Sequence, residues 1–318
     1  MSDLPRFVHI REEGPREGFQ IEPGPIATAD KIALVDALSG CGVRHIQVAS
    51  FVSPKAVPGW ADAEQVVAGS APKPGVDYTA LWFNEQGAQR AKAFADRLHL
   101  EAAIITSASE TFSRKNLNRG RAEQLDVVRR TTATHLALGI PVTRVGVMAA
   151  FGCNYEGEVP VAAVLRGIED GLAIATEAGC AIRDVTLADS MGWVTPGRVE
   201  RRVGEVRSRW PDLTLVLHLH DTRGLGIAGA HAGLRMGVAH FDTTVAGLGG
   251  CPFAGQPGAT GNIASEELVL LCEEMGIPTG VDLEALIEAG RLAERIVGRQ
   301  LPSTVLRSGS FRARRLAA

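Results

Sequence analysis

Two histidines, His218 and His220, are separated by one residue in the apolar run LVLHLHD, residues 215–221. Side chains two positions apart in an extended chain point the same way and lie about 6.5–7 Å apart, so a strand would present both imidazoles on one face. Such a pair could hold one metal ion. Histidines that pack against a core and bond to a backbone carbonyl are also common, so the pair alone leaves both possibilities open.

The elements that must position these histidines follow a repeating pattern. Short runs rich in β-branched residues predict strands, and longer stretches with apolar positions at helical spacing, several ending in glycine, predict helices. The predicted strands span residues 7–12, 45–50, 78–82, 100–106, 144–151, 184–190, 214–220 and 240–247. Eight strand–helix units at intervals of roughly thirty residues favour an α/β fold of the (β/α)8 TIM-barrel type.

An open, dinucleotide-binding sheet fits the sequence less well. The segment GPREGFQ, residues 14–20, follows the first predicted strand but lacks the G-x-G-x-x-G spacing. An amphipathic stretch at 282–300 follows the eighth unit, and no linker or change of composition interrupts the chain. We therefore predict a single domain over 1–318, with a barrel over about 5–278 and a C-terminal helical extension over about 279–318.

Polar side chains collect at the carboxyl ends of the predicted strands, where a parallel barrel brings distant parts of the chain together. Beyond the eighth strand, a glycine-rich segment follows. In chain order, the residues at these positions are Arg16, Glu17, Gln47, Ser50, Asp189, His218, His220, Cys251 and Asn262. The sequence thus predicts a site at one end of the barrel.

Composition excludes several classes of protein. Of the 318 residues, 45% are hydrophobic and 22% are charged, as in an ordinary globular protein, and the net charge of −3 with no dense basic stripe argues against nucleic-acid binding. The short basic tail, residues 307–318, is expected to be a solvated end or a subunit contact. No run is apolar and long enough for a membrane span, and the N-terminus lacks the pattern of a signal peptide. The five cysteines form no C-x-x-C pair, which is typical of a cytoplasmic protein.

Several segments, taken in order, match the signatures of one enzyme family. They are GPREG, ASFVSPKAVP, SASETFSRKNLN, FGCNYEG, LADSMGWVTPG, HLHDTRGLG and VAGLGGCPFAGQPGATGN. The chain therefore resembles 3-hydroxy-3-methylglutaryl-CoA lyase. The resemblance implies a metal-dependent barrel that cleaves a 3-hydroxy-acyl-CoA by retro-Claisen chemistry into acetyl-CoA and a keto acid, which is acetoacetate for the family substrate. It also implies an acyl-CoA substrate and a homodimer.

The resemblance also implies roles for individual residues. By this resemblance, the metal ligands are Glu17, His218, His220 and Asn262. Arg16 matches the arginine that steadies the developing enolate, Asp189 matches an acidic active-site residue, and Cys251 matches the catalytic cysteine, the expected proton donor to the enolate. Ser190 stands where the family often has threonine.

The implied ligands decide which metals fit. Two imidazoles, a carboxylate and an amide oxygen suit octahedral Mg²⁺ or Mn²⁺ and do not exclude Zn²⁺ or Fe²⁺. Two neighbouring acids have a structural alternative: Asp221 would either orient the histidines or cap the following helix, and Asp189 would either act as a base or metal neighbour or cap a helix.

Two residues and the length of one loop depart from the family pattern. Glu17 replaces the aspartate of the P-R-D-G motif, which adds about 1.3–1.5 Å of reach. Gln47 replaces a glutamate, so the site is less negative by one charge. The loop between Cys251 and Asn262 is about two residues longer than the family norm. These changes are expected to bear on substrate choice and rate.

Other functions remain open at this point. They are a lyase with a different or bulkier 3-hydroxy-acyl-CoA substrate, a Claisen-type synthase, a keto-acid aldolase, and a homologue that binds acyl-CoA or metal without turnover. An iron oxygenase that uses His218, His220 and Glu17 as a facial triad is a further alternative.

Overall fold

The computed structural model describes residues 4–250 and 260–311. By their internal contacts these residues divide into two compact units, and each is described by itself. The central unit runs from Leu100 to Phe241. The terminal unit combines Arg6–His99, Asp242–Gly250 and the chain from Thr260 onward.

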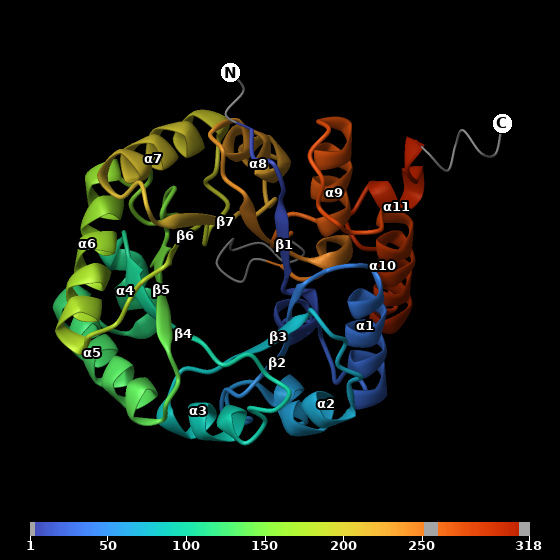
Figure 1. Cartoon of the computed structure of the whole chain (residues 1–318), viewed down its shortest axis with the longest axis horizontal. Helices are drawn as coiled ribbons and strands as arrows, with labels where there is room; N and C mark the ends of the chain where they lie inside the picture. The colour runs from blue at the N-terminus through green and yellow to red at the C-terminus, as the bar shows by residue number, and fades with distance from the viewer. Residues whose placement is uncertain (1–3, 251–259, 312–318) are drawn as a thin grey trace. The chain divides into compact units, whose positions relative to one another are not determined.

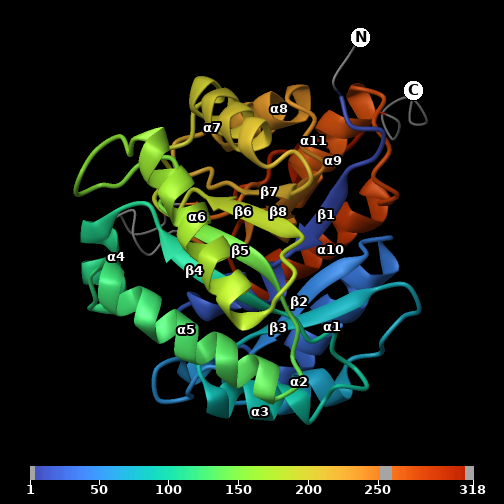
Figure 2. The same ribbon diagram turned by 60° about the vertical axis from the view of Figure 1, so that its left-hand side comes forward.

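The central unit contains four consecutive parallel strands in the order β4–β5–β6–β7. The strands are β4 (Ala102–Ser107), β5 (Val142–Met148), β6 (Asp184–Ala188) and β7 (Thr214–His218). Its helices are α4 (Glu110–Leu117), α5 (Arg121–Ala137), α6 (Val161–Ala178), α7 (Pro196–Arg209) and α8 (Gly226–Arg235). Helices α5 and α6 run across β4 and β5 and pack on them (Figure 2). The register pairs Ser107 with Met148 and Ala188 with His218, so the carboxyl ends of these strands form one edge.

Local sequence sets the ends of the central helices. Helix α4 begins after Ser109, whose hydroxyl accepts a hydrogen bond from the Phe112 N–H at 3.0 Å. Helix α7 begins after Thr195, another side-chain cap, with Pro196 at its first position. Helix α6 ends at Gly179, which adopts a φ of +70°. These are the start and stop signals of an alternating strand–helix chain.

The terminal unit contains β1 (His9–Glu12), β2 (His45–Ser50) and β3 (Asp77–Leu81), which pair in parallel in that order. Strand β8 (His240–Thr243) crosses the boundary between the units. The helical elements are η1 (Gly14–Gly18), α1 (Thr28–Gly40), η2 (Pro58–Trp60), α2 (Ala63–Gly69), α3 (Glu85–Lys92), η3 (Val245–Gly247), α9 (Ser265–Glu274), α10 (Leu283–Val297) and α11 (Val305–Ser308). Helix α1 lies between α2 and α10 and packs against both (Figure 1).

All eight predicted strands are present, with ends shifted by a few residues. The eighth is much shorter than the predicted 240–247, because the chain turns into η3 after Thr243. There the backbone N–H of Ala246, whose φ is +58°, donates to the buried carboxylate of Glu266. Helices α10 and α11 confirm the predicted C-terminal helical extension. Among the helices of residues 4–250 and 260–311, none has the length and hydropathy to cross a membrane.

Candidate active site

Arg16 is the centre of a polar cluster at the start of the terminal unit. It lies in η1, a single π-helical turn after β1, and is 8% exposed. Its Nη2 donates to Glu17 Oε2 at 3.0 Å and to Glu13 Oε2 at 3.4 Å, and its Nε donates to Gln47 Oε1. The sequence prediction that Arg16, Glu17 and Gln47 lie together is confirmed within this unit. Glu13 was missed, although it directly precedes the GPREG motif and extends a run of acidic residues at the end of β1.

Two fully buried carboxylates fix the backbone around this cluster. Glu12 accepts hydrogen bonds from Gly14 N at 2.7 Å, from Val245 N at 2.8 Å and from the Ser265 hydroxyl. Burial raises the pKa of Glu12 to about 7. Burial likewise raises the pKa of Glu266, which holds η3, well above its usual range. No motif pointed to these two acids.

Asn262 is the one predicted metal ligand of the terminal unit that is almost completely buried, at 1% exposure. Neither its Oδ1 nor its Nδ2 has a hydrogen-bond partner among the described residues. Leaving a buried amide unsatisfied costs about 1–3 kcal/mol, so such a group calls for a ligand. Gly261 lies so close to Gly250 that a Cβ at position 261 would be 2.9 Å from the Gly250 carbonyl oxygen, so only glycine fits next to Asn262 without a shift.

The two histidines converge in the central unit. His218 is the last residue of β7 and His220 lies just beyond it, rather than within the strand as predicted. Their Nε2 atoms lie 3.2 Å apart, with ring planes tilted by 55°. One Nε2–H can donate to the other at this distance. The backbone positions of such a pair lie about 6.5–7 Å apart, and the two side chains lean together so that their nitrogens come to 3.2 Å.

Asp189 follows β6 directly and is completely buried. Its carboxylate accepts the backbone N–H groups of Trp193 at 2.6 Å and Val194 at 3.1 Å, and that of His220 also bonds to it. Burial raises the pKa of Asp189 to about 6 despite these bonds. The alternative that Asp189 caps a helix is wrong, because Thr195 caps α7. Asp189 instead joins the 193–194 turn to the histidine segment.

Two further predicted residues have structural partners. The Ser190 hydroxyl accepts the Ala149 N–H at 2.9 Å, which fixes the end of β5 to the segment after β6. Asp221 Oδ1 accepts the N–H of Gly226, the first residue of α8, at 2.7 Å. The helix-end alternative for Asp221 therefore has direct support. Cys251 lies outside the described residues.

These observations fit a divalent cation. Two ligand atoms bound about 2.1 Å from one ion lie about 3.0 Å apart at octahedral angles and about 3.4 Å apart at tetrahedral angles. The 3.2 Å separation of the imidazole nitrogens lies between these values. The partnerless amide of Asn262 offers an oxygen ligand of the kind that hard cations prefer. The donors therefore fit the metal without selecting Mg²⁺, Mn²⁺ or Zn²⁺.

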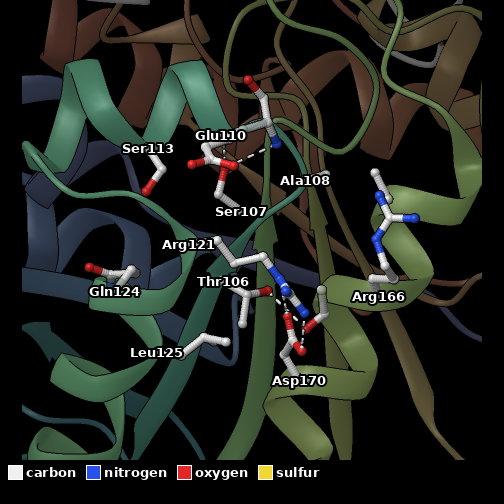
Figure 3. A pocket seen from close by; sticks show the side chains of 13 residues that line it. Thr106, Ser107, Ala108, Glu110, Ser113, Arg121, Gln124, Leu125, Arg166 and Asp170 are labelled. Carbon is white, nitrogen blue, oxygen red and sulfur yellow. Dashed lines mark hydrogen bonds and ion pairs between the residues drawn. The ribbon is translucent and has the colours of Figure 1, made fainter.

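A separate cavity of about 110 Å³ lies in the central unit among β4, α4, α5 and α6 (Figure 3). None of the predicted site residues lines it. Arg121 and Asp170 form a two-pronged ion pair across it, at 2.6 and 2.8 Å. The Thr106 hydroxyl donates to the Gly167 carbonyl. Because no predicted site residue lines it, this cavity is not the candidate active site.

Comparisons with known proteins show the family. Residues 8–293 match the HMGL-like family. A lyase of Pseudomonas aeruginosa, described as acting on 3-hydroxy-3-isohexenylglutaryl-CoA and hydroxymethylglutaryl-CoA, is 40% identical over 301 residues, which cover 93% of this chain and 95% of that protein.

Two solved structures are similar over nearly the full length. The HMG-CoA lyase of Bacillus subtilis has a TM-score of 0.86 and 38% identity, covering 96% of this chain and 98% of that one. The HMG-CoA lyase of Acinetobacter baumannii, solved with coenzyme A and 3-methylmalate, has a TM-score of 0.84 and 36% identity, covering 96% of both chains. The predicted TIM-barrel fold class is thereby confirmed. The chain belongs to the HMGL-like family of carbon–carbon lyases.

Proposed function

We propose that this protein is a divalent-metal-dependent lyase that cleaves 3-hydroxy-3-methylglutaryl-CoA, or a close analogue, into acetyl-CoA and a keto acid. For the named substrate the keto acid is acetoacetate. The observation that carries the proposal is the approach of the His218 and His220 Nε2 atoms to 3.2 Å in a chain of this family. The coenzyme A in the Acinetobacter structure supports an acyl-CoA substrate.

In this proposal Glu17, His218, His220 and Asn262 would hold the cation, with Mg²⁺ or Mn²⁺ preferred. When bound, the ion would lower the pKa of the substrate hydroxyl and orient a nearby carboxylate. Arg16 donates to Glu17 Oε2 and so holds the carboxylate that would bind the cation. The Asn262 amide gains the partner that its burial calls for.

Arg16 would stabilise the negative charge that grows on the thioester oxygen as the C2–C3 bond breaks. A guanidinium is always charged, and Glu13, Glu17 and Gln47 hold this one in a fixed direction. Preorganised charge of this kind needs no rearrangement during the reaction. Removing it is expected to lower kcat rather than to raise KM alone.

One of the remaining predicted residues would donate a proton to the enolate, and the others would position parts of the site. Cys251 is proposed to donate the proton that converts the departing enolate into acetyl-CoA. The Asp189 carboxylate would position His220 by accepting the backbone N–H of His220. The Ser190 hydroxyl would hold the end of β5 by accepting the Ala149 N–H. Asp221 would set the start of α8.

The test is a turnover assay on purified protein. Metal-free protein is incubated with a panel of 3-hydroxy-acyl-CoA compounds, with and without Mg²⁺ or Mn²⁺, and the products are measured by mass spectrometry. We expect metal-dependent release of acetyl-CoA and a keto acid. Protein that binds the metal but cleaves none of the panel would overturn the proposal in favour of a non-catalytic acyl-CoA-binding homologue.

A lyase that prefers a longer 3-alkyl group is the second candidate. The Pseudomonas relative is described as acting on an isohexenyl compound, and Glu17 and Gln47 depart from the family pattern. The same panel separates the two candidates if it includes the methyl and isohexenyl substrates. A higher kcat/KM for the isohexenyl substrate than for the methyl substrate would favour the second candidate.

We further propose that the protein works as a cytoplasmic homodimer, each chain one domain over residues 1–318. Light scattering measures the mass in solution, to be compared with 33.6 kDa for one chain. Limited proteolysis tests the single domain, because separate domains would release stable fragments.

A further inference from the structure

Lys31 of α1 is a charged side chain with only 2% exposure. Its Nζ donates to the Gly59 carbonyl at 2.5 Å and to Asp62 Oδ1 at 2.6 Å. Asp62 also accepts the Thr28 hydroxyl at 2.7 Å. Lysine is almost never fully buried unless it is paired, because removing an ammonium from water is costly. The contacts that offset this cost all fix the short segment 58–62.

Trp60 lies at the centre of this segment and is completely buried. The Lys31 ammonium lies 4.6 Å from the centre of the indole ring, in cation–π contact. The indole Nε1–H donates to the backbone carbonyl of Arg16 at 3.2 Å. Lys31, Trp60 and Arg16 therefore form one continuous chain of contacts from α1 to η1.

We propose that Trp60, held by Lys31 and Asp62, is a positioning residue that sets the direction of the Arg16 side chain. The guanidinium contacts fix only the far end of that side chain, and the indole N–H fixes the backbone from which it extends. This inference rests on the role proposed above for Arg16.

The short turn explains why such support matters. At the start of the turn, the Arg16 and Glu17 N–H groups both donate to the Glu13 carbonyl, at 3.1 and 2.7 Å. The Arg16 carbonyl accepts the indole N–H of Trp60, which ties this peptide to η2. A small rotation of this peptide would move the guanidinium, and misplacement of a catalytic group by about 1 Å can cost about a hundredfold in rate.

The test is Trp60→Phe in the full-length, metal-loaded protein. Phenylalanine keeps an aromatic ring under Lys31 but lacks the N–H donor. We expect kcat to fall about 3- to 10-fold, as for the loss of one hydrogen bond, with KM changed less than about twofold. The Arg16 Nε–H signal in a ¹⁵N-arginine NMR spectrum, assigned with Arg16→Lys, should shift. Trp210→Phe, a tryptophan of the central unit, serves as the matched control and should change neither.

A positioning role requires both effects. Either a shifted Arg16 signal with unchanged kcat or a lower kcat with an unchanged signal overturns the inference. Thr28→Val, which removes one support of Asp62, should lower kcat about twofold and provides the test if Trp60→Phe does not fold. If Arg16→Lys itself leaves kcat unchanged, the proposed role of Arg16 fails. If Arg16→Lys lowers kcat and Trp60→Phe does not, only the present inference fails.

Discussion

The carboxylate of Glu12 accepts a hydrogen bond from the backbone nitrogen of Val245 at 2.8 Å, across 233 positions of sequence. The same carboxylate accepts the N–H of Gly14, the first residue of η1. One buried acid therefore joins the turn that carries Arg16 and Glu17 to the segment that follows β8. These hydrogen bonds lie wholly within the terminal unit. They depend on the Glu12 carboxyl group, whose charge changes near neutral pH.

Glu12→Gln tests how the contribution of Glu12 to the unfolding free energy depends on pH. Burial raises the folded-state pKa of Glu12 to about 7 from its usual value of 4.5, so the folded protein holds this proton more tightly than the unfolded chain. Its contribution is fully present below about pH 4.5 and is lost as pH rises through about 7. Between pH 5 and pH 8, wild type should lose about 2 kcal/mol of unfolding free energy relative to Glu12→Gln. Urea unfolding at both pH values measures the difference.

The exposed glutamate Glu205 gives the control for this experiment. Glu205→Gln should follow wild type at both pH values. An identical pH dependence in wild type and Glu12→Gln would show that Glu12 does not carry a raised pKa in the folded protein.

Removal of the proposed ligands should weaken metal binding. His218→Ala or His220→Ala is expected to lower Mn²⁺ affinity at least about a hundredfold, and Asn262→Ala at least about tenfold, because each removes one donor. Isothermal titration of metal-free protein measures these affinities directly. His231→Ala, an exposed histidine on α8, should bind as wild type does. Unchanged affinity in the two strand-end variants would remove the basis for the metal site.

The departures from the family pattern should select the substrate. Glu17→Asp shortens the side chain by one methylene and Gln47→Glu adds a charge beside Arg16 Nε. We expect each change, and the double variant most, to shift the kcat/KM ratio of methyl to isohexenyl substrates at least about fivefold. A ratio that stays constant while both rates change together would show that these positions set rate rather than specificity.

Asp189→Asn distinguishes a structural acid from a chemical one. An amide cannot accept all three backbone N–H groups, and its own NH₂ would face a donor, so we expect a loss of about 2–4 kcal/mol in unfolding free energy. Metal affinity should fall with it, since His220 loses its support. The exposed Asp212→Asn is the matched control. A stable Asp189→Asn protein without turnover would instead assign Asp189 a direct part in proton transfer.

Much of the fold was predictable because its signals are local. Apolar runs marked every strand to within a few residues, except β8, which ends early at Thr243. Capping residues such as Ser109 and Thr195 begin helices through bonds to the next turn. The alternation of the two kinds of segment gave the barrel class, and the spacing of His218 and His220 placed both imidazoles on one side of the chain.

The sequence by itself thus determined the order of elements, the family and the candidate ligands, because these depend on residue type and short spacing. Tertiary structure alone decided that Glu12 bonds to Val245 and that Asp189 accepts the N–H groups of a turn rather than capping a helix. It alone also decided that Lys31 contacts the Trp60 ring, whose N–H donates to the Arg16 carbonyl. Each of these contacts depends on how packed elements orient buried polar groups. The need to satisfy such groups is set by the surrounding core, which no local pattern encodes.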